Sequence, residues 1–206
     1  NEKYFNNLKS CAQYLLIYPS ENGQEGQKEY YGMFKMLKES HIQFDVIDGR
    51  ETAILNEKIK QYTAVILPGI SSLDNSIVEI IKQSKIIIIG SGLALKNQKE
   101  NLEELFSLRL DRKLEKVRGS YILTEPKTVF SSFYDKEWVY LDKDYYYMIP
   151  DAGNKNYLPL IEASMYGPPE RCFGHVVTEE PSITVNPGRS IYFPWKIGEL
   201  YYEQGY

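Results

Sequence analysis

Four apolar runs divide the first half of the chain, and each ends at or next to a proline or a glycine. The runs are Ala12–Pro19, His41–Gly49, Thr63–Gly69 and Lys85–Gly90. Runs that stay apolar over five or more residues are typical of strands buried on both faces of a parallel sheet. The pattern therefore predicts four buried strands.

The segments between these runs carry apolar residues at helical spacing. The first predicted helix would bury Tyr30, Met33, Phe34 and Leu37. A short helix is expected over residues 56–62, and the next one, capped by Asp74, would bury Ile77, Ile80 and Ile81. Strands that alternate with helices predict an α/β, flavodoxin-like fold with a doubly wound parallel sheet. Right-handed crossovers give its core the strand order 2-1-3-4.

The second half loses this alternation after a helix expected near Asn97–Leu108. Short strand-like pieces follow at Gly119–Leu123, Trp138–Leu141, Tyr145–Ile149, Ser182–Val185 and Ser190–Pro194. They predict a mixed or antiparallel C-terminal extension of the same sheet. Because no linker-like change of composition separates the halves, residues 1–206 are expected to form a single domain.

The C-terminal end is rich in aromatic residues. In the predicted strand Ser190–Pro194, Ile191 and Phe193 would lie on one face and Tyr192 on the other. Beyond it, Trp195, Tyr201 and Tyr202 are candidates for an interface with another domain or subunit. The alternative is that these rings cover the domain's own core.

Composition narrows the possible partners. The 206 residues are 43% hydrophobic and 25% charged, with 24 basic and 28 acidic side chains and a net charge of −4. Basic residues are scattered, which disfavours nucleic acid and anionic membranes as partners, and no apolar run approaches the ~18 residues of a membrane span. Cys11 and Cys172 form no metal or disulfide pattern, which fits a reducing, cytoplasmic compartment. The chain starts without Met, as a fragment would.

Two loops at strand ends are candidates for binding or catalytic sites. A phosphate loop at Ser20–Gly26 is disfavoured by Glu21 and Glu25, so no flavin, nucleotide or other cofactor is predicted. Gly90-Ser91-Gly92 sits where hydrolase-like folds carry a nucleophile elbow. However, Ile89 and Leu93 occupy the positions of the elbow glycines, and an amidotransferase needs Cys at the elbow. A degenerate, structural turn is the favoured interpretation.

A third candidate is the irregular segment Tyr166–His175. It holds Pro168, Pro169, Glu170, Arg171, Cys172 and His175. Cys172 and His175 are conceivable as a nucleophile and its base. The favoured interpretation is a rigid loop whose Glu170 and Arg171 contact a neighbouring surface, since a guanidinium fork suits a carboxylate partner.

The order of several motifs resembles a known family. The motifs are residues 12–18 (AQYLLIY), 30–37 (YYGMFKML), 41–47 (HIQFDVI), 62–68 (YTAVILP), 166–172 (YGPPERC) and 188–202 (GRSIYFPWKIGELYY). Together they are similar to the degenerate class I glutamine amidotransferase-like domain that follows the catalytic barrel in several glycoside hydrolase families. These include β-galactosidases with a trimerisation domain. The last two motifs resemble a related group of glycoside hydrolase-like proteins more closely.

The resemblance implies a non-catalytic accessory or assembly domain from the C-terminal part of a larger carbohydrate-active protein. In such enzymes the catalytic carboxylates lie on the barrel, so this domain should not hydrolyse glycosides by itself. Its expected partners are that barrel or a neighbouring subunit, including a second copy. The alternative is a stand-alone hydrolase or amidotransferase-like enzyme with Cys172 or Ser91 as nucleophile. The length of the native reading frame distinguishes the two.

Overall fold

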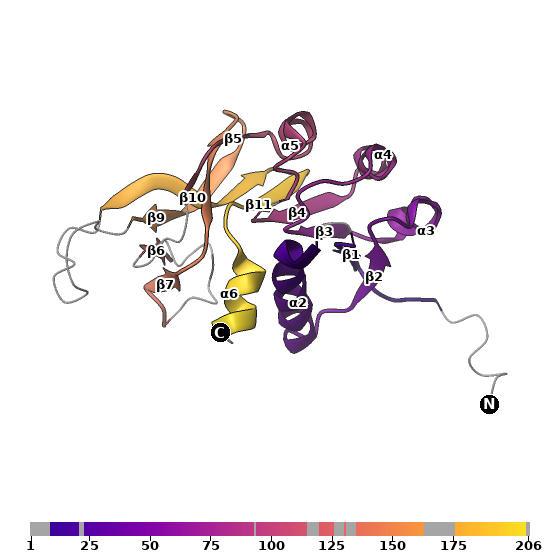
Figure 1. Ribbon diagram of the computed structural model, residues 1–206, viewed down its shortest axis with the longest axis horizontal. Coiled ribbons are helices and arrows are strands. Elements are labelled where there is room, and N and C mark those ends of the chain that lie inside the picture. Colours follow the sequence, from indigo (N-terminus) through magenta and orange to yellow (C-terminus); the bar gives the residue numbers. More distant parts are fainter. Residues whose placement is uncertain are drawn as a thin grey trace.

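The computed structural model describes residues 9–20, 23–92, 94–114, 120–125, 130, 135–162 and 176–204. In its first half, strands and helices alternate as predicted (Figure 1). The elements are β1 (Tyr14–Tyr18), α2 (Gly23–Glu39), β2 (Phe44–Asp48), α3 (Thr52–Lys58) with the 3-10 turn η1 (Ile59–Gln61), β3 (Ala64–Pro68), α4 (Asn75–Ser84), β4 (Ile87–Ser91) and α5 (Lys99–Phe106). The predicted N-cap is confirmed, because the Asp74 carboxylate accepts the backbone N–H of Ser76.

The second half consists of strands and one terminal helix. These are β5 (Leu108–Leu114), β6 (Ser120–Leu123), β7 (Trp138–Leu141), β8 (Tyr145–Pro150), β9 (Lys155–Ile161), β10 (Val177–Asn186), β11 (Ser190–Phe193) and α6 (Ile197–Gln204). All five short strands expected from the sequence are present. None of the described helices is both long and apolar enough to cross a membrane.

One sheet connects the two halves. Its strand order is β2-β1-β3-β4-β11-β10-β9-β6-β7, and β5 pairs with β8 in a separate two-stranded sheet. The first four strands are parallel in the predicted order 2-1-3-4, and β11 extends them by pairing parallel with β4. The pairs from β11 to β7 are antiparallel. The flavodoxin-like fold with a mixed C-terminal extension is confirmed.

Two strands were not expected from the sequence, β5 and β9. Strand β9 contains Pro159, and a proline argues against a central strand because it donates no ladder hydrogen bond. The structure resolves this conflict by placing Pro159 opposite Pro181 of β10, next to a shift in register. The two missing donors therefore fall at a single irregular position of the ladder.

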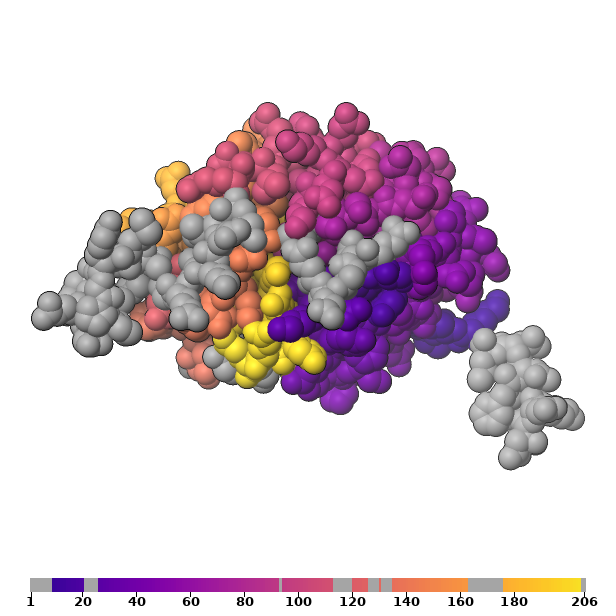
Figure 2. Space-filling model, in the orientation of Figure 1, coloured from indigo at the N-terminus to yellow at the C-terminus, as the bar shows by residue number. Residues whose placement is uncertain are grey.

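Helices cover both faces of the parallel strands (Figure 1). Helices α3, α4 and α5 lie on one face, over a core that contains Leu15, Val65 and Ile88. Helices α2 and α6 lie on the other face, where α2 packs on Leu16 and Ile66. Figure 2 shows the yellow C-terminal segment directly against the indigo-to-purple N-terminal segment. Helices α2 and α6, which are distant in sequence, thus form one layer.

Helices α2 and α6 touch at two glycines. A Cβ atom on Gly32 would lie 1.7 Å from the carbonyl oxygen of Gly198, and one on Gly198 would lie 2.2 Å from the carbonyl oxygen of Glu29. Because of this contact, the side of α2 that carries Glu29 and Gly32 is buried. The expectation that Phe34 is buried was therefore wrong, because its side chain is exposed.

We predict that Gly32→Ala destabilises the protein although alanine favours a helix. The new methyl group has no room between the two backbones, so the free energy of unfolding should fall by about 1–3 kcal/mol. Gly153→Ala is the matched control, because nothing lies within 4 Å of its added Cβ, and it should be neutral or slightly stabilising. Urea denaturation measures both. Equal effects would contradict the close helix contact.

Candidate functional site

The elbow lies at the end of β4, where the sheet meets α6. Ser91 is the last residue of the strand, and Gly92 follows with φ +57°. The Gly92 N–H donates to the carbonyl of Phe193 (2.8 Å), and the Gly69 N–H donates to the carbonyl of Ser91 (3.1 Å). The backbone of the elbow is therefore held by both neighbouring strands, β3 and β11.

The side chain of Ser91 binds a carboxylate from α2. Its hydroxyl donates to Oε1 of Glu29 (2.6 Å), and Oε2 of Glu29 accepts the backbone N–H of Glu199 (2.7 Å). Ser91 is 0% exposed and Glu29 is 1% exposed. Glu199 lies in the first turn of α6, whose N–H groups have no partner within the helix. Glu29 therefore caps α6 from another helix and binds the elbow with its second oxygen.

Burial raises the pKa of Glu29 above its ordinary value of 4.5. Desolvation disfavours the charged form of a carboxyl group, and this is the largest effect at Glu29. Hydrogen bonds from Ser91 and from the backbone of α6 favour the carboxylate and oppose the shift. The positive end of the α6 dipole acts in the same direction as these bonds.

A serine beside a carboxylate has the elements of a nucleophile and a base, but here the pair is enclosed. Ser91 has no exposed surface, and a Cβ on Gly92 would lie 3.0 Å from Cγ of Lys196. A substrate could reach the hydroxyl only if α6 left its place. The arrangement favours a structural turn and assigns the hydroxyl to holding Glu29.

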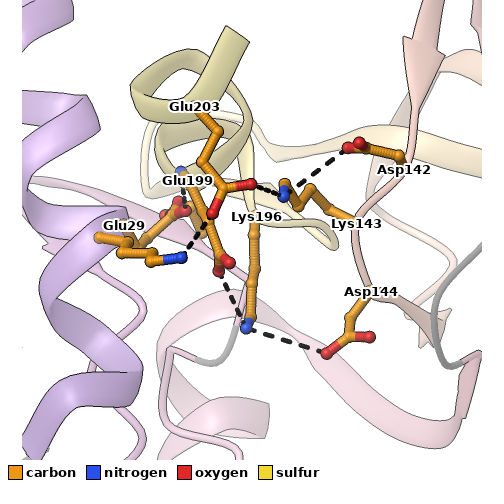
Figure 3. Close-up of polar contacts among 9 residues, drawn as sticks. Glu29, Asp142, Lys143, Asp144, Lys196, Glu199 and Glu203 are labelled. Carbon is orange, nitrogen blue, oxygen red and sulfur yellow. Dashed lines mark hydrogen bonds and ion pairs between the residues drawn. The ribbon is translucent and has the colours of Figure 1, made fainter.

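A network of ion pairs in two groups, one around Glu203 and one around Lys196, holds α6 against α2 and against the turn between β7 and β8 (Figure 3). Its members are Lys28, Lys143, Lys196, Asp142, Asp144, Glu199 and Glu203. Lys196 lies 3.0 Å from Glu199 and 3.8 Å from Asp144. Glu203 binds Lys28 and Lys143 at once, and these lysines lower its pKa. The network joins α2, α6 and the turn between β7 and β8.

The aromatic candidates separate into buried and exposed residues. Trp195 is 6% exposed, and its indole N–H donates to the carbonyl of Ser182 (3.0 Å). It belongs to the chain's own core and does not offer its ring to a partner. Tyr201 is partly buried and donates to Glu39, whereas Tyr202 is exposed. The predicted alternation in β11 is confirmed, since Tyr192 lies in the opposite core cluster from its two neighbours.

The remaining candidates from the sequence belong to the segment Tyr166–His175. Pro168, Pro169, Glu170, Arg171, Cys172 and His175 lie outside the described residues, as does Leu93. Among the residues that the structure describes, no group of three or more His, Cys, Asp or Glu side chains could hold a metal ion.

Sequence reasoning missed Glu29, the central residue of this site. Its position carried a signal, because Glu29, Gly32, Met33 and Met36 recur at the i, i+3, i+4 and i+7 spacing of a buried helical face. A glutamate on such a face needs a buried hydrogen-bond partner. The partner itself lies 62 residues away in sequence, and no local pattern identifies it.

Comparison with known proteins finds similar folds. No family model and no curated protein sequence matches the chain. A ThuA-like protein from Bacteroides uniformis is similar over 95% of this chain and 87% of its own, with TM-score 0.63 and 12% identity. A β-galactosidase from the psychrophilic Marinomonas ef1 is similar over 100% of this chain and 30% of its own (TM-score 0.61, 11% identity).

An exo-β-1,4-mannosidase from Opitutaceae bacterium strain TAV5 is also similar, over 99% of this chain and 34% of its own, with TM-score 0.61 and 9% identity. At identities this low the likeness shows the fold alone. The chain thus spans about a third of the length of the two glycoside hydrolases and most of the length of the ThuA-like protein.

We predict that Ser91→Ala lowers stability, because it removes a donor from a buried carboxyl group. The free energy of unfolding should fall by about 1–3 kcal/mol. The matched control is Ser182→Ala, since Ser182 is equally buried and its hydroxyl has no partner among the described residues. Urea denaturation should show little change for the control. If both variants behaved alike, the Ser91–Glu29 bond would not contribute.

The raised pKa of Glu29 predicts a pH dependence. The carboxyl group of Glu29 loses its proton at lower pH in the unfolded chain than in the folded chain. The contribution of this pKa difference to the free energy of unfolding is therefore fully present below the ordinary pKa of 4.5. That stability is lost as the pH rises through the raised value. The free energy of unfolding of the wild type relative to Glu29→Gln should therefore fall with rising pH. Denaturation between about pH 4 and pH 8 tests this.

Glu57→Gln controls for the loss of one surface carboxylate, since Glu57 is exposed on α3. A Glu29→Gln difference that stayed constant across the pH range would contradict the assignment.

Proposed function

We propose that this chain is a non-catalytic accessory domain of a larger carbohydrate-active protein. The observation that carries the proposal is the enclosed elbow. Ser91, the residue at the nucleophile position, has no exposed surface and binds the buried Glu29. A fold shows nothing about activity by itself, so the argument rests on the site. In this site the Ser91 hydroxyl binds Glu29 and is covered from solvent.

The comparisons support this proposal through their coverage. Two glycoside hydrolases contain this fold as about a third of their length. The motif order of the sequence, with a degenerate amidotransferase-like pattern, points to the same kind of parent. In this proposal the catalytic carboxylates lie on a barrel that precedes the domain, and residues 1–206 form one domain that packs against that barrel or a neighbouring subunit.

The proposed parent acts in the cytoplasm. Cys11 is an exposed, free thiol, and thiols of this kind persist in reducing compartments.

We predict that the 206-residue chain turns over neither glutamine nor aryl glycosides and that a fluorophosphonate probe does not label Ser91. Substrate and probe both need access to a hydroxyl that α6 covers. Mass spectrometry of the probe-treated chain and steady-state assays measure these outcomes. Turnover that Ser91→Ala or Cys172→Ser abolishes would instead support a stand-alone enzyme.

The native reading frame provides a second test. The proposal expects several hundred codons for a barrel upstream of Asn1. A frame that starts near Asn1 would contradict it.

A further inference from the structure

Exposed apolar side chains gather on one side of the molecule. Ten large hydrophobic side chains are exposed among the described residues, and half of them belong to α2, α6 and the region of β2. These five, here called the aromatic face, are Tyr31, Phe34, Ile42, Val46 and Tyr202. Their exposed fractions are 37–48%. The rings of Tyr31 and Tyr202 lie 6.3 Å apart, so the face is continuous from α2 to α6.

A shallow groove of about 700 Å³ runs beside this face. It is lined by Phe34 and Lys38 of α2, by residues 41–46 and by residues 10–12. The ring of Phe34 packs edge-on against Phe44 (5.1 Å between centroids) and forms an apolar wall. Strand β2 is the last strand of the sheet, and no described strand pairs with its outer edge. Such an edge is open to a further partner.

The groove lies where the chain enters the domain. Residues 10–12 line it, and the Ser10 hydroxyl donates to the Asp45 carboxylate of β2 (2.9 Å). The described chain therefore starts along the β2 edge (Figure 1). Any polypeptide joined to Asn1 is tethered within about 30 Å of the groove, since nine residues span at most about 3.5 Å each. A tether this short gives a preceding domain a high effective concentration at the groove.

We propose that the aromatic face and its groove are the docking site for the domain that precedes Asn1 in the same polypeptide. This inference rests on the proposed function, which supplies that domain. The occupant is an apolar segment that covers Phe34, Ile42 and Val46. Lys38 lines the groove and forms no ion pair with a described residue, so the segment carries a carboxylate opposite it. Interfaces of this kind place apolar anchors inside a charged rim.

Cys11 provides a direct probe, because it is exposed and lines the groove. Maleimide labelling of Cys11 is followed by mass spectrometry in the 206-residue chain and in the full-length polypeptide. Labelling should be at least about tenfold slower in the full-length protein, where the tethered domain covers the thiol.

Val46→Lys should restore fast labelling in the full-length protein, because a lysine at an exposed edge position opposes docking. Ile149→Lys is the matched control: Ile149 is 45% exposed, as Val46 is 42% exposed, but lies on β8. The control should leave labelling slow. Urea denaturation of both variants in the 206-residue chain confirms that neither disturbs the fold.

Four outcomes would overturn the inference. If a preceding domain exists but Cys11 reacts equally fast in both proteins, or if the two lysine variants act alike, the groove is not the docking site, although the proposed accessory function stands. If the reading frame starts near Asn1, the proposed function fails as well. Protection of Cys11 in the 206-residue chain that grows with protein concentration would assign the groove to a second copy.

Discussion

The position of the C-terminal helix depends on one buried carboxyl group. Glu29 receives the hydroxyl of Ser91 on one oxygen and the first turn of α6 on the other. A carboxyl group without such partners would be costly to bury, by several kcal/mol. The three segments that meet at Glu29 therefore stabilise one another. The close Gly32–Gly198 contact adds to this attachment, because it brings the backbones of α2 and α6 together beside Glu29.

The same arrangement decides what the elbow can do. The turn after β4 is tight, with Gly92 at positive φ, and the carboxyl group of Glu29 lies within hydrogen-bond distance of Ser91. Reactivity would need this pair to face a space that admits a substrate. In this chain that space is occupied by α6 and by the stem of Lys196. The polar groups beside this turn serve the attachment of α6.

The parallel half of the fold could be predicted from the sequence because its strands are buried on both faces. Uninterrupted apolar runs such as Lys85–Gly90 leave little ambiguity, and right-handed crossovers then fix the strand order. The antiparallel half was harder to predict, because Pro159 argues against a strand at the position of β9. The strand is explained only by the pairing of Pro159 with Pro181 of β10, which the sequence does not reveal. Glu29 was missed for a related reason. Its meaning comes from Ser91 and α6, which are distant in sequence, so only the three-dimensional contact distinguishes it from a surface glutamate.

Two kinds of electrostatic contact hold α6, and they differ in how they respond to solvent. The Lys28–Glu203 ion pair lies partly exposed at the surface, where salt screens it and it contributes little. The bonds of Glu29 lie in the interior, where screening by salt is weak and the cost of a lost partner is larger. The Lys28–Glu203 pair therefore adds little to the attachment of α6. The helix is held by the bonds of Glu29, by the close glycine contact and by the less exposed ion pairs of Lys143 and Lys196.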